Sequence, residues 1–285
     1  MASPAAEKIR AGLVRFPPST DLAAERAGWE GWAAGQTLPA KISETFQTLG
    51  GVPGRLLVPA GAADGRLVVA FHGGGLVSGA SVTHRMLGAE LALACRQKVF
   101  LPDYSRLPEN SPQQVLADGI AVLSAARSES DVTVYADSSG AALALAAMQS
   151  MRDAAQRLPD RVVFFSAAID ATLSGRSFIE NEARDPTLSH ASLRHWQSVL
   201  TDIAPLDSPL LSPLFQPVHG LPPMLLLAGS DELWRDDSVR LAEQLRIAGG
   251  QATLRVYKDM WHVWPMSGAT PETYQAFAEF AAFLA

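Results

Sequence analysis

From about residue 65 onward, short apolar runs alternate with stretches whose apolar residues recur at helical spacing. The apolar runs are Leu67–Phe71, Val99–Leu101, Val132–Tyr135, Val162–Phe165 and Met224–Ala228, and a last strand is expected at Ala252–Tyr257. The helical stretches are His84–Arg96, Val115–Arg127, Ser139–Arg152, Ser238–Ala248 and Glu272–Leu284. Strands that are apolar throughout indicate burial on both faces. The pattern therefore predicts an α/β fold with a mostly parallel central sheet flanked by helices.

The segments outside this alternation predict two additions to the sheet. Ile42–Thr48 and Arg55–Val58, joined through a glycine pair, predict a leading antiparallel pair of strands. Residues of about 1–40 and 171–221 are rich in proline and aromatic residues and lack strand periodicity. We expect both segments to form a helical cap over one end of the sheet, within a single domain that spans residues 1–285.

Composition narrows the classes of protein to which the chain can belong. The net charge of −6 and the scattered basic residues exclude the clustered positive face of a nucleic-acid-binding protein. One cysteine, Cys95, excludes an internal disulfide, and its apolar neighbours predict a buried structural thiol. Met1–Arg10 lacks a signal-peptide core, and no apolar run approaches the ~20 residues of a membrane span. We expect a soluble, cytoplasmic protein by default.

The segment 135–141, which reads Tyr-Ala-Asp-Ser-Ser-Gly-Ala, joins a predicted strand to a predicted helix. A sharp strand-to-helix turn exposes a serine as a nucleophile, usually within Gly-x-Ser-x-Gly. Ser138 and Gly140 fit this pattern, and Ala136 stands at the first glycine position. A serine that only caps the helix would look similar, so the assignment depends on the rest of the chain.

A second motif, His72 followed by three glycines, comes directly after the strand Leu67–Phe71. Glycines at the carboxyl end of a strand allow backbone N–H groups to turn toward a ligand. Such donors stabilise the oxyanion of acyl transfer, together with the N–H of the residue after the nucleophile. We therefore predict an oxyanion hole built from Gly73, Gly74, Gly75 and Ser139.

A carboxylate and a histidine, the two groups that activate such a serine, each follow a later strand. His262, past the last strand, can accept the serine proton and return it to the leaving group. Asp231 follows Met224–Ala228 and is the carboxylate closest to that strand's end, so we predict that it orients the histidine. Competing carboxylates are Glu232, Asp236, Asp237 and Asp259. The order Ser–Asp–His is that of α/β-hydrolases.

The sequence contains no motif for binding a metal, a phosphate group or a dinucleotide. The remaining histidines have no metal-ligand spacing, and neither a phosphate-binding loop nor a dinucleotide-binding glycine pattern occurs. We expect no metal and no cofactor.

Together these motifs resemble those of the bacterial hormone-sensitive-lipase family of α/β-hydrolases, most closely its small esterase and epsilon-lactone hydrolase branch. The matching segments are Gly50–Gly54, His72–Gly75, residues 103–109 (Asp-Tyr-Ser-Arg-Leu-Pro-Glu), Ala136–Ala141, Gly229–Glu232 and Met260–Trp264. The resemblance covers most of the chain. It implies a carboxylic ester hydrolase with a helical cap and no cofactor. It also implies that Gly74, Gly75 and Ser139 donate to the oxyanion, that Gly73 supports the loop, and that the side chain of His72 holds the loop.

The chain departs from the family pattern at four positions. Ala136, Ser139 and Ala141 stand where the family has glycine, alanine and glycine. The arginine of the Asp-Tyr-Arg segment is absent, and Arg106 comes one place later. None of these changes removes a group that the mechanism needs. The hydroxyl of Ser139 is the most unusual, because it comes beside the predicted oxyanion hole.

We expect an enzyme that cleaves short to medium acyl esters or lactones. An apolar acyl pocket is predicted from Leu76 and three cap aromatics, Trp29, Phe178 and Trp196. An amidase or peptidase would use the same triad, and a non-catalytic binding protein could share the fold. The expected partner is a small-molecule ester or lactone, and an edge strand late in the sheet would also permit a homodimer.

Overall fold

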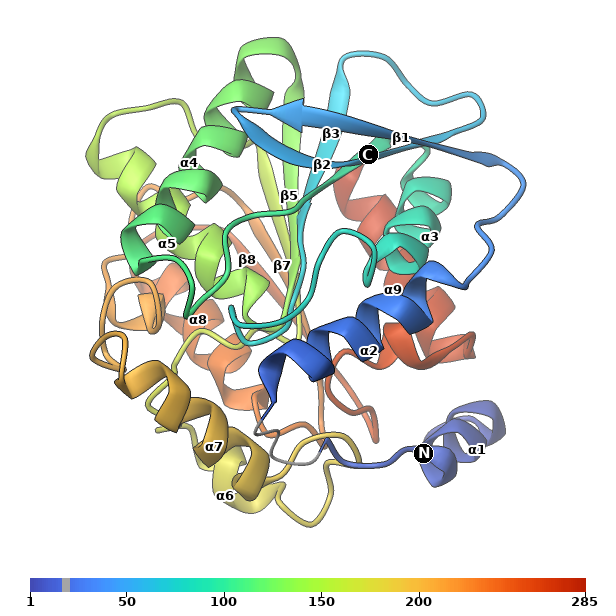
Figure 1. Ribbon diagram of the computed structural model, residues 1–285, viewed down its shortest axis with the longest axis vertical. Coiled ribbons are helices and arrows are strands. Elements are labelled where there is room, and N and C mark those ends of the chain that lie inside the picture. Colours follow the sequence, from blue (N-terminus) through green and yellow to red (C-terminus); the bar gives the residue numbers. More distant parts are fainter. Residues whose placement is uncertain (17–20) are drawn as a thin grey trace.

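The computed structural model describes residues 1–16 and 21–285. In this part of the chain, eight strands form one sheet in the order β1-β2-β4-β3-β5-β6-β7-β8 (Figure 1). The strands are β1 Ile42–Leu49, β2 Val52–Pro59, β3 Arg66–Phe71, β4 Lys98–Pro102, β5 Asp131–Asp137, β6 Arg161–Phe165, β7 Met224–Gly229 and β8 Ala252–Tyr257. β1 and β2 pair antiparallel, β2 is antiparallel to β4, and the other neighbours are parallel. The predicted sheet and its leading antiparallel pair are confirmed.

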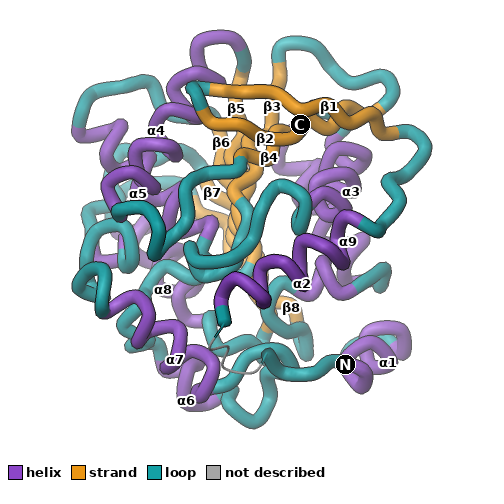
Figure 2. The backbone as a smooth tube through the Cα atoms, in the orientation of Figure 1, coloured by secondary structure: helices purple, strands orange, loops and turns teal. Residues whose placement is uncertain are grey.

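Helices cover both faces of the sheet (Figure 2). On one face lie α4 Pro112–Glu129, α5 Gly140–Asp153 and α8 Arg235–Ile247, and on the other lie α3 Arg85–Cys95 and α9 Pro271–Leu284. Alternate strand residues supply the two cores: Val69 and Phe71 join one apolar cluster, and Val68 and Ala70 join the other. Because successive side chains point to opposite faces, a strand packed on both sides must be apolar throughout.

Local signals set the starts of several helices. Ser111 caps α4 by accepting a hydrogen bond from the N–H of Gln114, and Thr270 caps α9 by accepting one from Thr273. A proline follows each cap residue, where its fixed φ suits the first helical turn. The five sequence-predicted helices are all present, with ends shifted by a few residues.

Four further helices lie near the carboxyl ends of the parallel strands (Figure 1). They are α1 Pro4–Gly12, α2 Leu22–Ala34, α6 Arg176–Glu180 and α7 His190–Thr201, and the short 3₁₀ turns are Pro213–Phe215 and Trp264–Ser267. The helices fall within the two segments predicted to form a cap, although residues 17–20 of the first segment lie outside the described residues. No described helix combines the length and apolarity that crossing a bilayer requires.

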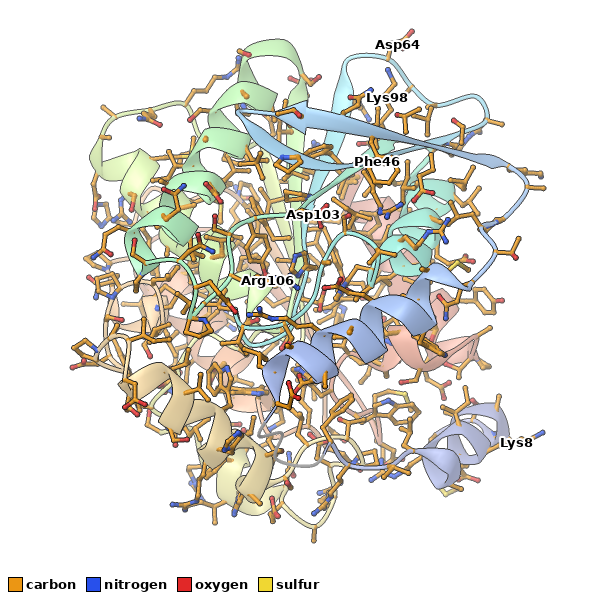
Figure 3. The ribbon with its side chains drawn as sticks, in the orientation of Figure 1. Lys8, Phe46, Asp64, Lys98, Asp103 and Arg106 are labelled. Carbon is orange, nitrogen blue, oxygen red and sulfur yellow. The ribbon has the colours of Figure 1, made fainter. Side chains whose placement is uncertain are left out.

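The loop after β4 fastens α2 to the body of the molecule (Figure 3). Asp103 accepts hydrogen bonds from the N–H and hydroxyl of Ser81 at 2.6 and 2.8 Å. Arg106, the arginine one place later than in the family pattern, pairs with Glu30 of α2 at 2.8 Å and donates to the carbonyl of Gly79 at 2.7 Å. Its shifted position therefore still supports a structural ion pair.

Cys95, at the end of α3, carries a free thiol that is largely buried. Burial raises the pKa of this thiol to about 11, which keeps it protonated and unreactive near neutral pH. This environment agrees with the structural role predicted from its apolar neighbours.

Candidate active site

Ser138 lies in a strained turn between β5 and α5. Its φ of +50° is left-handed, which is uncommon for any residue with a side chain. The turn presses against β3 so closely that a Cβ on Gly140 would come within 2.3 Å of the carbonyl oxygen of Phe71. Ala136 is fully buried in β5, between Phe71 of β3 and Phe164 of β6, so its methyl group fits beneath the turn.

The side chains of Ser138, His262 and Glu232 form a hydrogen-bonded chain. Nε2 of His262 lies 2.9 Å from Oγ of Ser138, and Nδ1 of the same ring lies 2.9 Å from Oε2 of Glu232. The turn after β8 that carries the histidine is held by Ser166, whose hydroxyl accepts from the N–H of Val263 at 2.9 Å. The imidazole thus bridges a hydroxyl and a carboxylate, each on a different nitrogen.

Glu232 is fully buried, and its surroundings both oppose and support its charge. Burial raises the pKa of the Glu232 carboxyl above its usual value, whereas hydrogen bonds from His262, Ser166 and the N–H of Gly229 act in the opposite direction. Oε1 accepts the Gly229 N–H at 2.9 Å, which leaves Oε2 for the histidine. The carboxylate is therefore held in one orientation.

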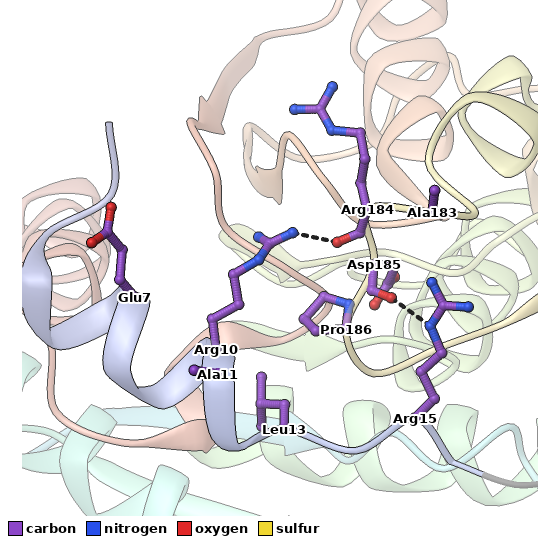
Figure 4. Close-up of a pocket in the computed structure, with 9 residues that line it drawn as sticks. All are labelled: Glu7, Arg10, Ala11, Leu13, Arg15, Ala183, Arg184, Asp185 and Pro186. Atoms are coloured by element: carbon purple, nitrogen blue, oxygen red, sulfur yellow. Dashed lines mark hydrogen bonds between the residues drawn. The ribbon is translucent and has the colours of Figure 1, made fainter.

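The prediction that Asp231 orients the histidine is wrong, because its carboxylate points elsewhere. Asp231 pairs with Arg10 of α1 at 2.9 Å and with Arg184 at 2.5 Å. Figure 4 shows the neighbouring hollow, where Arg10 and Arg15 donate to the backbone carbonyls of Arg184 and Asp185. Asp231 thus joins the N-terminal segment to the segment before α7, and its neighbour Glu232 takes the place beside His262.

The glycine loop after β3 lies against the serine turn. A Cβ on Gly73 would come within 2.9 Å of Cβ of Ser138, and the Gly73 N–H donates to Asp137 at 3.1 Å. Within residues 1–16 and 21–285, the N–H groups of Gly74, Gly75 and Ser139 meet no hydrogen-bond acceptor. The three groups predicted to donate to an oxyanion are therefore available to a ligand.

The side chain of His72 holds this loop through its backbone, and its Nε2 has no hydrogen-bond partner among the described residues. Its Nδ1 lies 2.9 Å from the carbonyl oxygen of Gly73, and its ring stacks on Tyr104 with centroids 4.2 Å apart. Burial and the nearby His84 lower the pKa of His72 well below its usual value, so the ring is neutral. This geometry agrees with the loop-holding role that the resemblance implies.

The four residues predicted to line an acyl pocket fall in different places. Leu76 is buried directly after the glycine loop, and Trp196 of α7 donates its indole N–H to the carbonyl of Gly75 at 2.8 Å. Phe178 packs in the apolar cluster against which Trp196 also lies. Trp29 contacts the ring of His84, with centroids 5.7 Å apart. The acyl pocket itself stays a prediction.

Two residues of the site escaped the sequence reasoning in different ways. The sequence predicts Glu232 only as a competitor of Asp231, and it does not predict Ser166 as a site residue. Both follow apolar strands, Ser166 directly after β6 and Glu232 three residues after β7. Polar residues just past a buried parallel strand were thus the available signal, since the carboxyl ends of such strands meet at one edge of the sheet.

Comparison with known proteins agrees with the predicted fold. A family model described as "alpha/beta hydrolase fold" matches residues 68–266. An esterase of Acinetobacter venetianus is 34% identical over 236 residues, which cover 79% of this chain and 77% of the relative. An acetyl-hydrolase of Streptomyces hygroscopicus is 32% identical over 269 residues, which cover 88% of this chain and 90% of the relative.

Two solved structures resemble nearly the whole chain. An esterase from the bacterial hormone-sensitive lipase family has a TM-score of 0.88 and 29% identity, and the match covers 100% of this chain and 98% of that one. A structure of EstE5 soaked with p-nitrophenyl butyrate has a TM-score of 0.90 and 27% identity, with coverage of 99% and 98%.

Proposed function

Since the chain belongs to the hormone-sensitive-lipase family of α/β-hydrolases and is a carboxylic ester hydrolase, we propose that it cleaves short to medium acyl esters or lactones through an acyl-enzyme on Ser138. The observation that carries this proposal is the chain of two 2.9 Å contacts that links Ser138 to His262 and His262 to Glu232. A serine hydroxyl is a poor nucleophile until a positioned base takes its proton, and this chain supplies such a base.

In the first half of the reaction, Oγ of Ser138 attacks the ester carbonyl while Nε2 of His262 accepts its proton. Glu232 accepts the N–H of Nδ1, which leaves Nε2 as the acceptor, and its charge stabilises the imidazolium that forms. The histidine then gives the proton to the leaving alcohol. In the second half, water attacks the acyl-enzyme by the same steps and regenerates the serine.

The N–H groups of Gly74, Gly75 and Ser139 would hold the negative oxygen of each tetrahedral intermediate. Their lack of other acceptors in the described part of the chain supports this role. Donors that are already aimed at a developing charge need no reorganisation during the reaction, and the loss of one typically costs about 3 kcal/mol of transition-state stabilisation.

Hydrolysis of p-nitrophenyl butyrate by the wild type and Ser138→Ala tests the proposal. We expect Ser138→Ala to lose about 10³-fold or more in kcat, because the remaining groups cannot form an acyl-enzyme. Ser128→Ala, on the exposed surface of α4, is the matched control and should keep the wild-type rate. Equal rates for wild type and Ser138→Ala would overturn the assignment.

Two further measurements separate the alternatives that share this fold. A serine-reactive phosphonate should form a stable adduct on Ser138, whereas a non-catalytic binding protein would form none. Matched p-nitrophenyl ester and p-nitroanilide substrates of equal acyl length compare ester with amide cleavage. We expect the ester to be hydrolysed faster, and a preference for the anilide would point to an amidase.

A further inference from the structure

One peptide group of the glycine loop, between Gly75 and Leu76, is hydrogen-bonded at both ends. Its carbonyl oxygen accepts the indole N–H of Trp196 at 2.8 Å. Its N–H donates to the hydroxyl oxygen of Ser139 at 3.1 Å. Trp196 belongs to α7 and Ser139 to the serine turn, so two distant segments hold one planar unit from opposite ends.

The backbone on either side of this peptide needs such support. Gly75 and Leu76 have φ values of +68° and +62°, and a leucine in the left-handed region is strained. The indole lies so close that a Cβ on Gly75 would come within 2.4 Å of its Nε1. Strained conformations persist only where the surroundings determine them, and the two hydrogen bonds provide that determination.

The same peptide adjoins a proposed oxyanion donor. Its carbonyl carbon is bonded to Cα of Gly75, so fixing the peptide also fixes the point from which the Gly75 N–H projects. Ser139 contributes twice, since its backbone N–H is another proposed donor and its hydroxyl holds the loop that carries the other two. The alanine that the resembled motif has at this position could not accept the Leu76 N–H.

We propose that Trp196 and Ser139 are positioning residues that together clamp the Gly75–Leu76 peptide and so couple the placement of α7 to the geometry of the oxyanion hole. This inference rests on the proposed function. It assigns the unusual hydroxyl of Ser139 to holding the loop and not to replacing a reacting group. It also gives α7 an influence on the chemical step that does not depend on contact with the acyl chain.

The test uses Trp196→Phe, which keeps a ring but removes the donor, and Ser139→Ala, which removes the acceptor. We expect each variant to lower kcat on p-nitrophenyl butyrate by about 10- to 100-fold with KM changed less than about threefold, because an oxyanion donor acts mainly in the transition state. Inhibition by a trifluoromethyl ketone, which forms an oxyanion on the serine, should weaken by the same factor as kcat.

Trp234→Phe is the matched control, because Trp234 packs edge-on against Trp196 with centroids 5.8 Å apart. The kcat of Trp234→Phe should stay within about twofold of wild type, because this variant removes no hydrogen bond to the Gly75–Leu76 peptide and so leaves the oxyanion donors in place. The kcat of the double variant Trp196→Phe/Ser139→Ala should be no more than about threefold below that of the less active single variant, since both hydrogen bonds hold the same peptide. The inference would be overturned if the kcat losses of the two single variants multiplied in the double variant, or if the clamp variants changed KM alone. A loss of kcat in Trp234→Phe equal to that in Trp196→Phe would also overturn it.

Amide hydrogen exchange of Leu76 gives a readout that does not depend on hydrolysis. Both clamp variants should accelerate this exchange at least tenfold, whereas Ser138→Ala should leave it unchanged. Faster exchange without a loss of kcat would overturn the positioning role. If Ser138→Ala kept wild-type hydrolysis, the proposed function would fail instead, and the exchange rates would still report on the clamp.

Discussion

Two adjacent carboxylates after β7 have separate tasks because their side chains point into different surroundings. Glu232 is fully buried and contacts His262, whereas Asp231 lies between two guanidinium groups. Hydrogen bonds from the N–H of Gly229 and from His262 hold the Glu232 carboxylate in one orientation, as suits a group that must orient an imidazole. Asp231 instead forms ion pairs with Arg10 and Arg184, which come from distant parts of the chain.

Glu232→Gln should therefore lower kcat by about 10³- to 10⁴-fold, because an amide can hold the imidazole in the wrong tautomer and cannot stabilise its charge. Measurement of kcat on p-nitrophenyl butyrate checks this expectation. Asp231→Asn is the matched control, and its kcat should stay within a few-fold of wild type. A larger loss in Asp231→Asn than in Glu232→Gln would contradict the assignment of Glu232 to the triad.

At the scale of elements, the serine turn depends on close backbone contact between α5 and β3. Gly140 begins α5, and a Cβ there would meet the Phe71 and His72 carbonyl oxygens at 2.3 and 2.6 Å. Backbone atoms cannot move aside as a flexible side chain can. The second glycine of the Gly-x-Ser-x-Gly pattern is thus required here by packing.

Gly140→Ala should destabilise the protein by about 3 kcal/mol or more, because α5 must move away from β3 to admit the methyl group. Gly28→Ala in α2 is the matched control, since its added Cβ would meet no atom within 4 Å. This control should stabilise the protein by up to about 1 kcal/mol through helix propensity. Urea unfolding of both variants tests the contrast, and equal shifts would contradict it.

At the scale of the whole molecule, Asp231 joins three segments that are far apart in sequence. Arg10 of α1 and Arg184 of the segment before α7 both reach this carboxylate, which is only 6% exposed. The N-terminal helix is thereby attached beside the loop that carries Glu232. The hollow in Figure 4 lies between these N-terminal and 183–186 segments.

Asp231→Asn should lower the free energy of unfolding by about 2 kcal/mol, because an ion pair with Arg10 and a charge-assisted hydrogen bond from Arg184 are lost at a buried site. Thermal unfolding measures this loss as a lower Tm. Asp64→Asn is the matched control: Asp64 is fully exposed and pairs with Lys98 at 3.6 Å, so its removal should leave Tm unchanged. An unchanged Tm in Asp231→Asn would show that the three segments are held by other contacts.

Much of the architecture could be predicted because its signals are local. Continuous apolar runs identified β3 to β7, since strands packed on both faces need apolar residues at every position, whereas the edge strand β8 was identified from the alternation of strands and helices. Ser138, His262 and the glycine loop could be found because each stands just past such a strand, where the carboxyl ends of parallel strands converge. These features depend on sequence order and on the period of two, both of which are readable in the chain alone.

Side-chain direction and contacts between distant segments were decided only in three dimensions. Asp231 and Glu232 are adjacent and chemically alike, so the shorter distance in sequence from β7 favoured Asp231, which was wrong. Only the packed structure shows that Glu232 reaches His262. The bond from Trp196 to Gly75 joins residues 121 positions apart, and no periodicity reports such a contact. The amino-acid order thus determined which groups could meet at the sheet edge, and tertiary packing selected the partners, because a side chain's orientation depends on neighbours that the linear pattern does not contain.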